Sequence, residues 1–158
     1  MPRIVILMSL TLAGCPLPTD DSGTTTATPT VPPEDFSACH AADGFDYAIV
    51  SGDTAASPVR IEGNTLSVDV GYGGGCETHL WAICWPDQSF MESDPVQAGL
   101  EIWHGGPPDM CDAYLFETLS FDLTPLHDAW QAAYGAGAGT IILNVAEAPE
   151  SVSYGFDG

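Results

Sequence analysis

Leu66-Ser67-Val68-Asp69-Val70-Gly71-Tyr72 is the stretch that decides the fold, because apolar residues alternate along it with small or polar ones. This period of two places Leu66, Val68, Val70 and Tyr72 on one face of a half-buried strand. Similar short runs, separated by turns rich in Gly and Pro, occupy residues 47–51, 79–85, 97–103, 113–121, 140–145 and 151–156. About seven short strands of this kind are typical of a β-sandwich. The sequence therefore predicts an all-β fold, an Ig-like or related antiparallel β-sandwich, with a small barrel as the alternative.

One segment, residues 124–134, has the pattern of a short helix. We expect Thr124 at the N-cap and Pro125 at the first helical position, where its missing N–H has no cost. Gly135 follows and is suited to ending the helix.

The N-terminus has the pattern of a secretory signal: a basic start, an apolar run and then small residues before a cleavage point. The apolar run is shorter than the roughly 20 residues that a membrane-spanning helix needs. Leu12-Ala13-Gly14-Cys15 resembles the lipobox of bacterial lipoproteins. That resemblance implies cleavage before Cys15 and attachment of acyl chains, such as palmitate, to this residue. A plain signal peptide and an apolar strand are the alternatives.

The residues after the signal divide into a linker and a domain. Residues 15–35 comprise the lipidated cysteine and a tract rich in Pro, Thr and Asp, which has little to bury and is predicted to be a disordered linker. Residues 36–158 form the predicted β-sandwich domain. Pro16, rather than Asp, follows Cys15 and favours the outer membrane over the inner one.

The charge is strongly one-sided: 22 acidic residues face only two basic ones, for a formal net charge of −20. Nucleic-acid binding depends on Lys and Arg at phosphates, so we expect no nucleic-acid partner. A solvated acidic surface is the simplest interpretation. Calcium among the carboxylates is an alternative, although the chain lacks a D-x-[DN]-x-[DN]-G loop.

Four cysteines follow Cys15, and an even number in an exported domain indicates disulfides. They are Cys39, Cys76, Cys84 and Cys111, and four cysteines allow three pairings, among which the sequence does not choose. One interpretation joins Cys76 to Cys111 and Cys39 to Cys84, with the nearby histidines in structural roles.

A second interpretation of the same region is a metal site. Cys76 and His79 form C-x-x-H after three glycines, and His104 and Cys111 follow one strand later. Two cysteines and two histidines suit a tetrahedral zinc or copper ion. The export signal argues against it, because metal-free thiols oxidise outside the cytoplasm. A mixed alternative keeps the disulfide and gives His79 and His104 alone to a metal.

Three stretches carry a family resemblance: Gly74-Gly75-Cys76-Glu77-Thr78-His79, residues 104–111, and Phe121-Asp122-Leu123-Thr124-Pro125-Leu126. This pattern resembles small bacterial lipoproteins, including the NigD-like lipoproteins. It covers about residues 70–126, and the chain departs from it in having Cys39 and Cys84 as an extra pair. The resemblance implies an exported all-β domain with no established activity.

Other candidates have simpler explanations. His40 is expected in a loop, and His127 with Asp128 lies in the predicted helix, where adjacent side chains do not face each other. The four tryptophans are expected mainly in the core, with a sugar-binding face as the alternative: Trp81, Trp85, Trp103 and Trp130.

The sequence predicts no enzyme. It contains neither G-x-S-x-G nor H-E-x-x-H, and without lysine it has no Walker loop or S-x-x-K motif. We therefore expect a lipid-anchored protein of the bacterial cell envelope. Its extracytoplasmic domain would act, without a cofactor, as a binding or structural module for an unknown protein or glycan. A metal-binding lipoprotein is the alternative.

Overall fold

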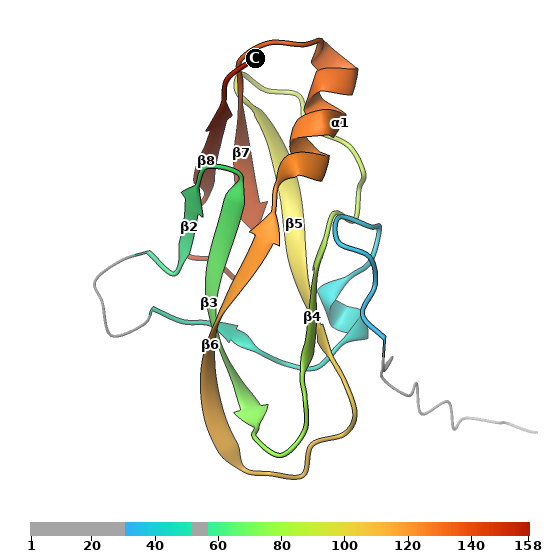
Figure 1. Ribbon diagram of the computed structural model, residues 1–158, viewed down its shortest axis with the longest axis vertical. Coiled ribbons are helices and arrows are strands. Elements are labelled where there is room, and N and C mark those ends of the chain that lie inside the picture. The colour runs from blue at the N-terminus through green and yellow to red at the C-terminus, as the bar shows by residue number, and fades with distance from the viewer. Residues whose placement is uncertain (1–30, 52–56) are drawn as a thin grey trace, which may run out of the picture.

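The computed structural model describes residues 31–51 and 57–158, which form a β-sandwich of two four-stranded sheets (Figure 1). This confirms the predicted all-β class. The predicted signal peptide, Cys15 and nearly all of the predicted linker lie outside the described residues. Among the described residues, no helix combines the length and apolar character needed to cross a membrane.

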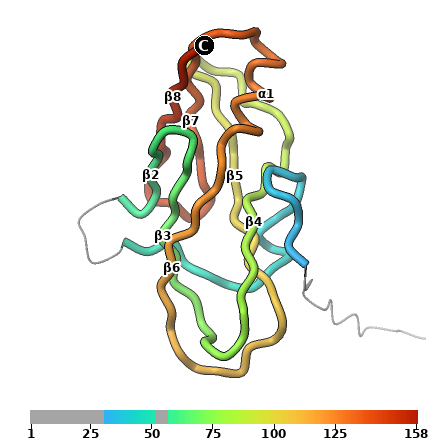
Figure 2. The backbone as a smooth tube through the Cα atoms, viewed as in Figure 1, coloured from blue at the N-terminus to red at the C-terminus, as the bar shows by residue number. Residues whose placement is uncertain are grey.

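The elements follow one another from a short 3₁₀ helix to a C-terminal strand, as the tube in Figure 2 traces. Their bounds are η1 Ala41–Asp43, β1 Ala48–Ile49, β2 Val59–Glu62, β3 Thr65–Gly74, β4 Leu80–Cys84, β5 Val96–Gly105, β6 Ala113–Asp122, α1 Thr124–Tyr134, β7 Gly139–Val145 and β8 Val152–Phe156.

Strand β3 organises the first sheet. It pairs with β6 along its whole length and, on its other edge, with β2 and then β1, all antiparallel. Leu66, Val68 and Val70 point inward and are fully buried, as their alternation predicts. Burying each such side chain contributes about 1.5–3 kcal/mol. Strand β2 was not predicted from the sequence and has only four residues.

The second sheet has the order β4-β5-β7-β8 and differs from the prediction in one respect. Strands β5 and β7 pair in parallel, so the sandwich is mixed rather than purely antiparallel. The reason lies in the connection between them. The chain leaves β5, runs through β6 in the other sheet and returns through α1, a crossover long enough to bring β7 in beside β5 in the same direction.

The outer edge of β4 is covered by the start of the domain. The N–H of Ile83 donates to the Asp35 carboxylate at 2.9 Å, and the N–H of Trp85 donates to the Ser37 carbonyl at 2.8 Å. A disulfide between Cys39 and Cys84, with Cα atoms 5.1 Å apart, fastens the same segment. This cover satisfies backbone groups that an open edge would expose.

Helix α1 occupies the predicted residues and ends at Gly135, whose φ of 99° suits glycine. The predicted N-cap is wrong by one position, because Leu123 precedes the first helical residue, Thr124. The Asp122 carboxylate accepts hydrogen bonds from the Thr124 N–H and hydroxyl, at 3.0 and 2.7 Å. An acidic side chain thus takes the capping role expected of Thr124.

The end of the sandwich away from α1 holds two connections side by side, between β3 and β4 and between β5 and β6 (Figure 1). Both contain residues that the sequence analysis marked as candidates.

Candidate functional site

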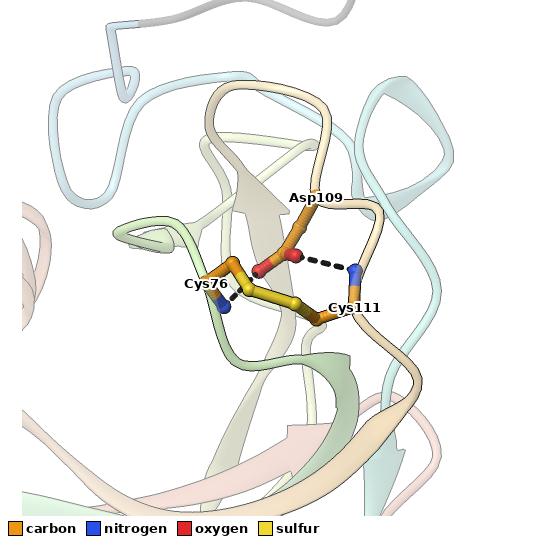
Figure 3. Close-up of side chains that lie close together, drawn as sticks. All are labelled: Cys76, Asp109 and Cys111. Atoms are coloured by element: carbon orange, nitrogen blue, oxygen red, sulfur yellow. Dashed lines mark hydrogen bonds between the residues drawn. A yellow bond between two sulfur atoms is a disulfide. The ribbon is translucent and has the colours of Figure 1, made fainter.

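A second disulfide, between Cys76 and Cys111, joins these two connections (Figure 3). The Cα atoms are 5.8 Å apart, within the usual range for a bridge. Together with Cys39–Cys84, this is the pairing that the disulfide interpretation proposed.

The Asp109 carboxylate holds the same two connections together by hydrogen bonds. Its Oδ2 accepts the N–H groups of Gly75, Cys76 and Glu77 at 2.8, 3.0 and 3.0 Å. Its Oδ1 accepts the N–H of Cys111 at 2.9 Å. These four donors, Cys111 and Glu77 first, hold the pKa of Asp109 well below its usual range. The group is therefore a fixed negative charge beside the disulfide.

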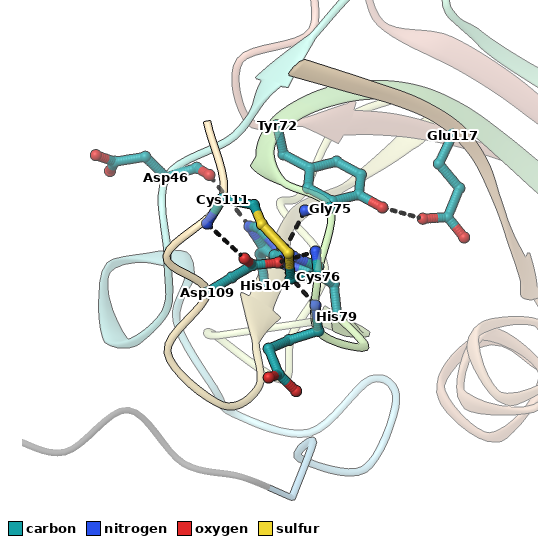
Figure 4. A network of polar contacts seen from close by, with 10 residues as sticks. Asp46, Tyr72, Gly75, Cys76, His79, His104, Asp109, Cys111 and Glu117 are labelled. Atoms are coloured by element: carbon teal, nitrogen blue, oxygen red, sulfur yellow. Dashed lines mark hydrogen bonds and ion pairs between the residues drawn. A yellow bond between two sulfur atoms is a disulfide. The ribbon is translucent and has the colours of Figure 1, made fainter. Parts of the chain in front are cut away.

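Two histidines continue this network inward (Figure 4). His79 Nε2 lies 3.3 Å from Asp109 Oδ2, and His79 Nδ1 lies 2.7 Å from His104 Nε2. His104 Nδ1 lies 3.1 Å from the Asp46 carbonyl oxygen. The groups at the two ends of this series of contacts, the Asp109 carboxylate and the Asp46 carbonyl, can only accept hydrogen bonds. Three hydrogen bonds therefore need three ring protons, one more than two neutral imidazoles carry. Two neutral rings can therefore form only two of these three contacts as hydrogen bonds at one time.

His104 is almost completely buried, with 1% of its surface exposed. Its ring stacks on Trp81, with centroids 3.9 Å apart and planes at 7°. Burial lowers the pKa of His104 to about 4, because the charged ring would lose its hydration.

Gly74 makes the contact between His79 and Asp109 possible. Its φ is +143°, a conformation that residues with side chains rarely adopt. A Cβ at this position would also lie 2.8 Å from Asp109 Oδ2 and against the His79 ring. The glycine run noted in the sequence therefore has a steric reason at this residue.

Aromatic side chains enclose the histidine pair. Tyr72 packs against both rings at steep angles, with centroids 4.6 Å from His79 and 5.1 Å from His104. Its hydroxyl donates to Glu117 at 3.0 Å, and burial together with this carboxylate raises the pKa of Tyr72 to about 12. Burial also raises the pKa of Tyr47 to about 12. Neither tyrosine is an acid or a base near neutral pH.

The tetrahedral metal hypothesis is wrong for this structure. The sulfurs of Cys76 and Cys111 are bonded to each other, so neither is a thiolate ligand. The proximity of Asp109 to both sulfurs therefore does not make a metal centre. His79 and His104 direct nitrogens at each other, and a metal shared by these two rings, the mixed alternative, would have to replace their hydrogen bond.

The remaining candidates lie elsewhere. His40 flanks η1 at the surface, 3.5 Å from Glu101, and His127 lies on α1. Trp85 and Trp103 are buried. Trp81 and Trp130 pack against the core. The tryptophans therefore belong to the packed interior, as the sequence favoured, and do not form a sugar-binding face.

Two features of the structure were not predicted from the sequence. Asp109 was visible in the H-x-x-x-x-D-x-C spacing but had no assigned role. Tyr114 and Phe116 are largely exposed, although they lie in a predicted strand. Their positions, two residues apart and out of phase with the buried Leu119 and Phe121, were the available signal.

No protein-family model and no curated protein matches the chain, so the NigD-like resemblance remains a hypothesis. Three solved structures are similar. A "putative lipoprotein" of Bacteroides fragilis has 12% identity and a TM-score of 0.44, over 87% of this chain and 66% of that one. A "putative toxin related protein" of Parabacteroides distasonis has 18% identity and a TM-score of 0.41, over 70% and 50%.

The third, a protein of unknown function from Bacteroides vulgatus, has 13% identity and a TM-score of 0.38, over 73% of this chain and 49% of that one. The chain thus spans between about half and two thirds of the length of these proteins. With TM-scores below 0.5, these similarities do not assign a function.

Proposed function

We propose that this protein is anchored by lipid in the bacterial cell envelope and that its β-sandwich acts outside the cytoplasm as a binding or structural module. The observation that carries the proposal is the pairing of every cysteine among the described residues into a disulfide. Stable disulfides belong to oxidising compartments. The lipobox-like Leu12-Ala13-Gly14-Cys15 agrees with this, since such a sequence directs export and lipid attachment.

Binding or display, rather than catalysis, also agrees with the candidate site. His79, His104 and Asp109 bond to one another and to backbone groups, and Asp109 holds two connections closed. Such a network stabilises one end of a domain. We therefore assign the His-Asp cluster a structural role.

Cell fractionation of a Cys15→Ser variant tests the proposal. The parent protein should sediment with membranes and enter a detergent phase, and Cys15→Ser should be found in the soluble fraction. Thr19→Ser, in the same segment, is the matched control and should behave as the parent. Cys15→Ser protein that stays with membranes would contradict lipid anchoring at this residue.

A further inference from the structure

The outer face of the β3–β6 ladder carries two exposed aromatic side chains. Tyr114 is 57% exposed and Phe116 is 69% exposed. Alternation along β6 puts both on the same face, and their ring centroids are 5.2 Å apart with planes at 80°. The two rings therefore adjoin and form one exposed aromatic patch on the surface of the sheet.

The facing strand leaves this surface open. Gly73 and Gly71 lie directly opposite Tyr114 and Phe116 in the register. A Cβ on Gly71 would lie 2.8 Å from the Tyr114 ring, so the ring rests against the backbone there. Among the described residues, no atom apart from Gly73 and its two chain neighbours lies within 4 Å of a Cβ position on Gly73. The Tyr114 ring therefore lies on the glycine backbone of β3, and the Phe116 ring is nearly perpendicular to it.

Polar groups fixed in position adjoin the rings. Asp69 accepts hydrogen bonds from the Arg60 guanidinium at 2.7 Å and from the Thr118 hydroxyl at 2.6 Å. These donors, Arg60 first, lower the pKa of Asp69, which is therefore an oriented carboxylate. A hollow of about 370 Å³ adjoins them, and the residues on its wall include Asp69, Thr118, Phe116, Ser51 and Glu117.

The charges on this face restrict its ligand. Arg60 is the only Lys or Arg among the described residues, and its partner Asp69 neutralises it. The whole chain carries −20, so a polyanion would be repelled. The surface offers aromatic faces for apolar C–H groups and oriented acceptors for hydroxyls. A neutral sugar presents both chemistries on one ring.

We propose that Tyr114, Phe116, Asp69 and Thr118 form a binding site for a neutral polysaccharide. The proposal rests on the binding-module function and names its ligand class. Stacking on the two rings supplies affinity, and hydrogen bonds to Asp69 and Thr118 fix the orientation of the sugar.

Native gel electrophoresis through soluble polysaccharides tests this site. The full chain, held in a polyoxyethylene detergent free of sugar groups, is run through gels containing neutral glucan, mannan, xylan or galactan, and through polygalacturonate as the acidic probe. At least one neutral polymer should retard the protein. Tyr114→Ala and Phe116→Ala should each weaken that binding about tenfold or more.

Tyr134→Ala is the matched control, because Tyr134 is 41% exposed but lies on α1. It should bind as the parent does. Asp69→Asn, with the fold retained, should also weaken binding, which separates a sugar site from a merely apolar patch. Near-ultraviolet circular dichroism of each variant establishes that the fold is retained.

Three results would overturn the proposal: no retardation by any neutral polymer, retardation by polygalacturonate alone, or self-association that Tyr114→Ala abolishes. The last would make the face an interface between copies of this chain. Failure here, with Cys15→Ser still released from membranes, would remove the sugar site and leave the anchored module. Retained sugar binding, with Cys15→Ser still bound to membranes, would keep the sugar site and remove lipid anchoring at Cys15.

Discussion

Acidification should destabilise the domain through His104, and His104→Phe should remove that effect. Burial holds the pKa of His104 at about 4 in the folded protein, against 6.5 when unfolded. The unfolded chain therefore binds the proton first as the pH falls. The stability that His104 contributes is complete above pH 6.5 and is lost progressively down to about pH 4.

The magnitude follows from the two pKa values. At 1.36 kcal/mol for each pH unit between them, the free energy of unfolding falls by roughly 3 kcal/mol, as an order of magnitude. The pKa of Asp109 is held well below its usual range, so this carboxylate stays charged across the interval. Acidification also relieves repulsion among 22 acidic residues, which acts in the opposite direction. The quantity to compare is therefore the pH dependence of the free energy of unfolding in the parent and in the variant.

Urea unfolding followed by tryptophan fluorescence at pH 7, 6, 5 and 4 measures this difference. His104→Phe keeps an aromatic ring on Trp81 but does not titrate. Tyr154→Phe is the control, because it removes another hydrogen bond of a buried ring, to Asn64 at 2.9 Å, and should keep the parent slope. Parallel curves for the parent and His104→Phe would refute the reasoning.

Three further predictions concern the same end of the molecule. Replacing Cys76 and Cys111 together by Ala should lower the free energy of unfolding by about 4 kcal/mol, from the freed loop of the unfolded chain; an unchanged urea midpoint would contradict this. Asp109→Asn should lower the melting temperature and speed proteolysis between β5 and β6. Equal cleavage rates in the parent and the variant would show that the hydrogen bonds of Asp109 do not hold the two connections together. Tyr72→Phe should cost about 1 kcal/mol in urea unfolding through the lost bond to Glu117, and no cost would show that bond to be irrelevant to stability.

The sequence predicted the strands best where burial is one-sided. The alternation of Leu66, Val68 and Val70 has a direct physical counterpart, since one face of β3 is buried. The parallel pairing of β5 with β7 was not predictable in the same way, because local periodicity does not report how distant strands are connected. Strand β2 was missed since four residues carry too little pattern.

Two cysteines and two histidines of the candidate site were named from the sequence, with the disulfide as one of two interpretations, whereas Asp109 had no predicted role. The fold brings Cys76 and His79, in the connection after β3, close to His104 at the end of β5 and Cys111 in the connection after it, and both the disulfide and the metal interpretation required that proximity. The Cys76–Cys111 disulfide decides between them. The role of Asp109 was not predicted, because hydrogen bonds to backbone groups more than 30 residues away leave no signal in spacing alone. The exposed rings of Tyr114 and Phe116 were missed because they were counted only as strand residues.

Disulfide mapping of protein isolated from the cell envelope tests the central claim, that this is an oxidised extracytoplasmic β-domain, most directly. Thiols are blocked before unfolding, and the chain is cut at acidic residues, where cleavage after Glu77 separates Cys76 from Cys84. We predict cross-linked peptides joining Cys39 to Cys84 and Cys76 to Cys111, with none of the four blocked. Blocked thiols at these positions, or a link between Cys76 and Cys84, would contradict the account.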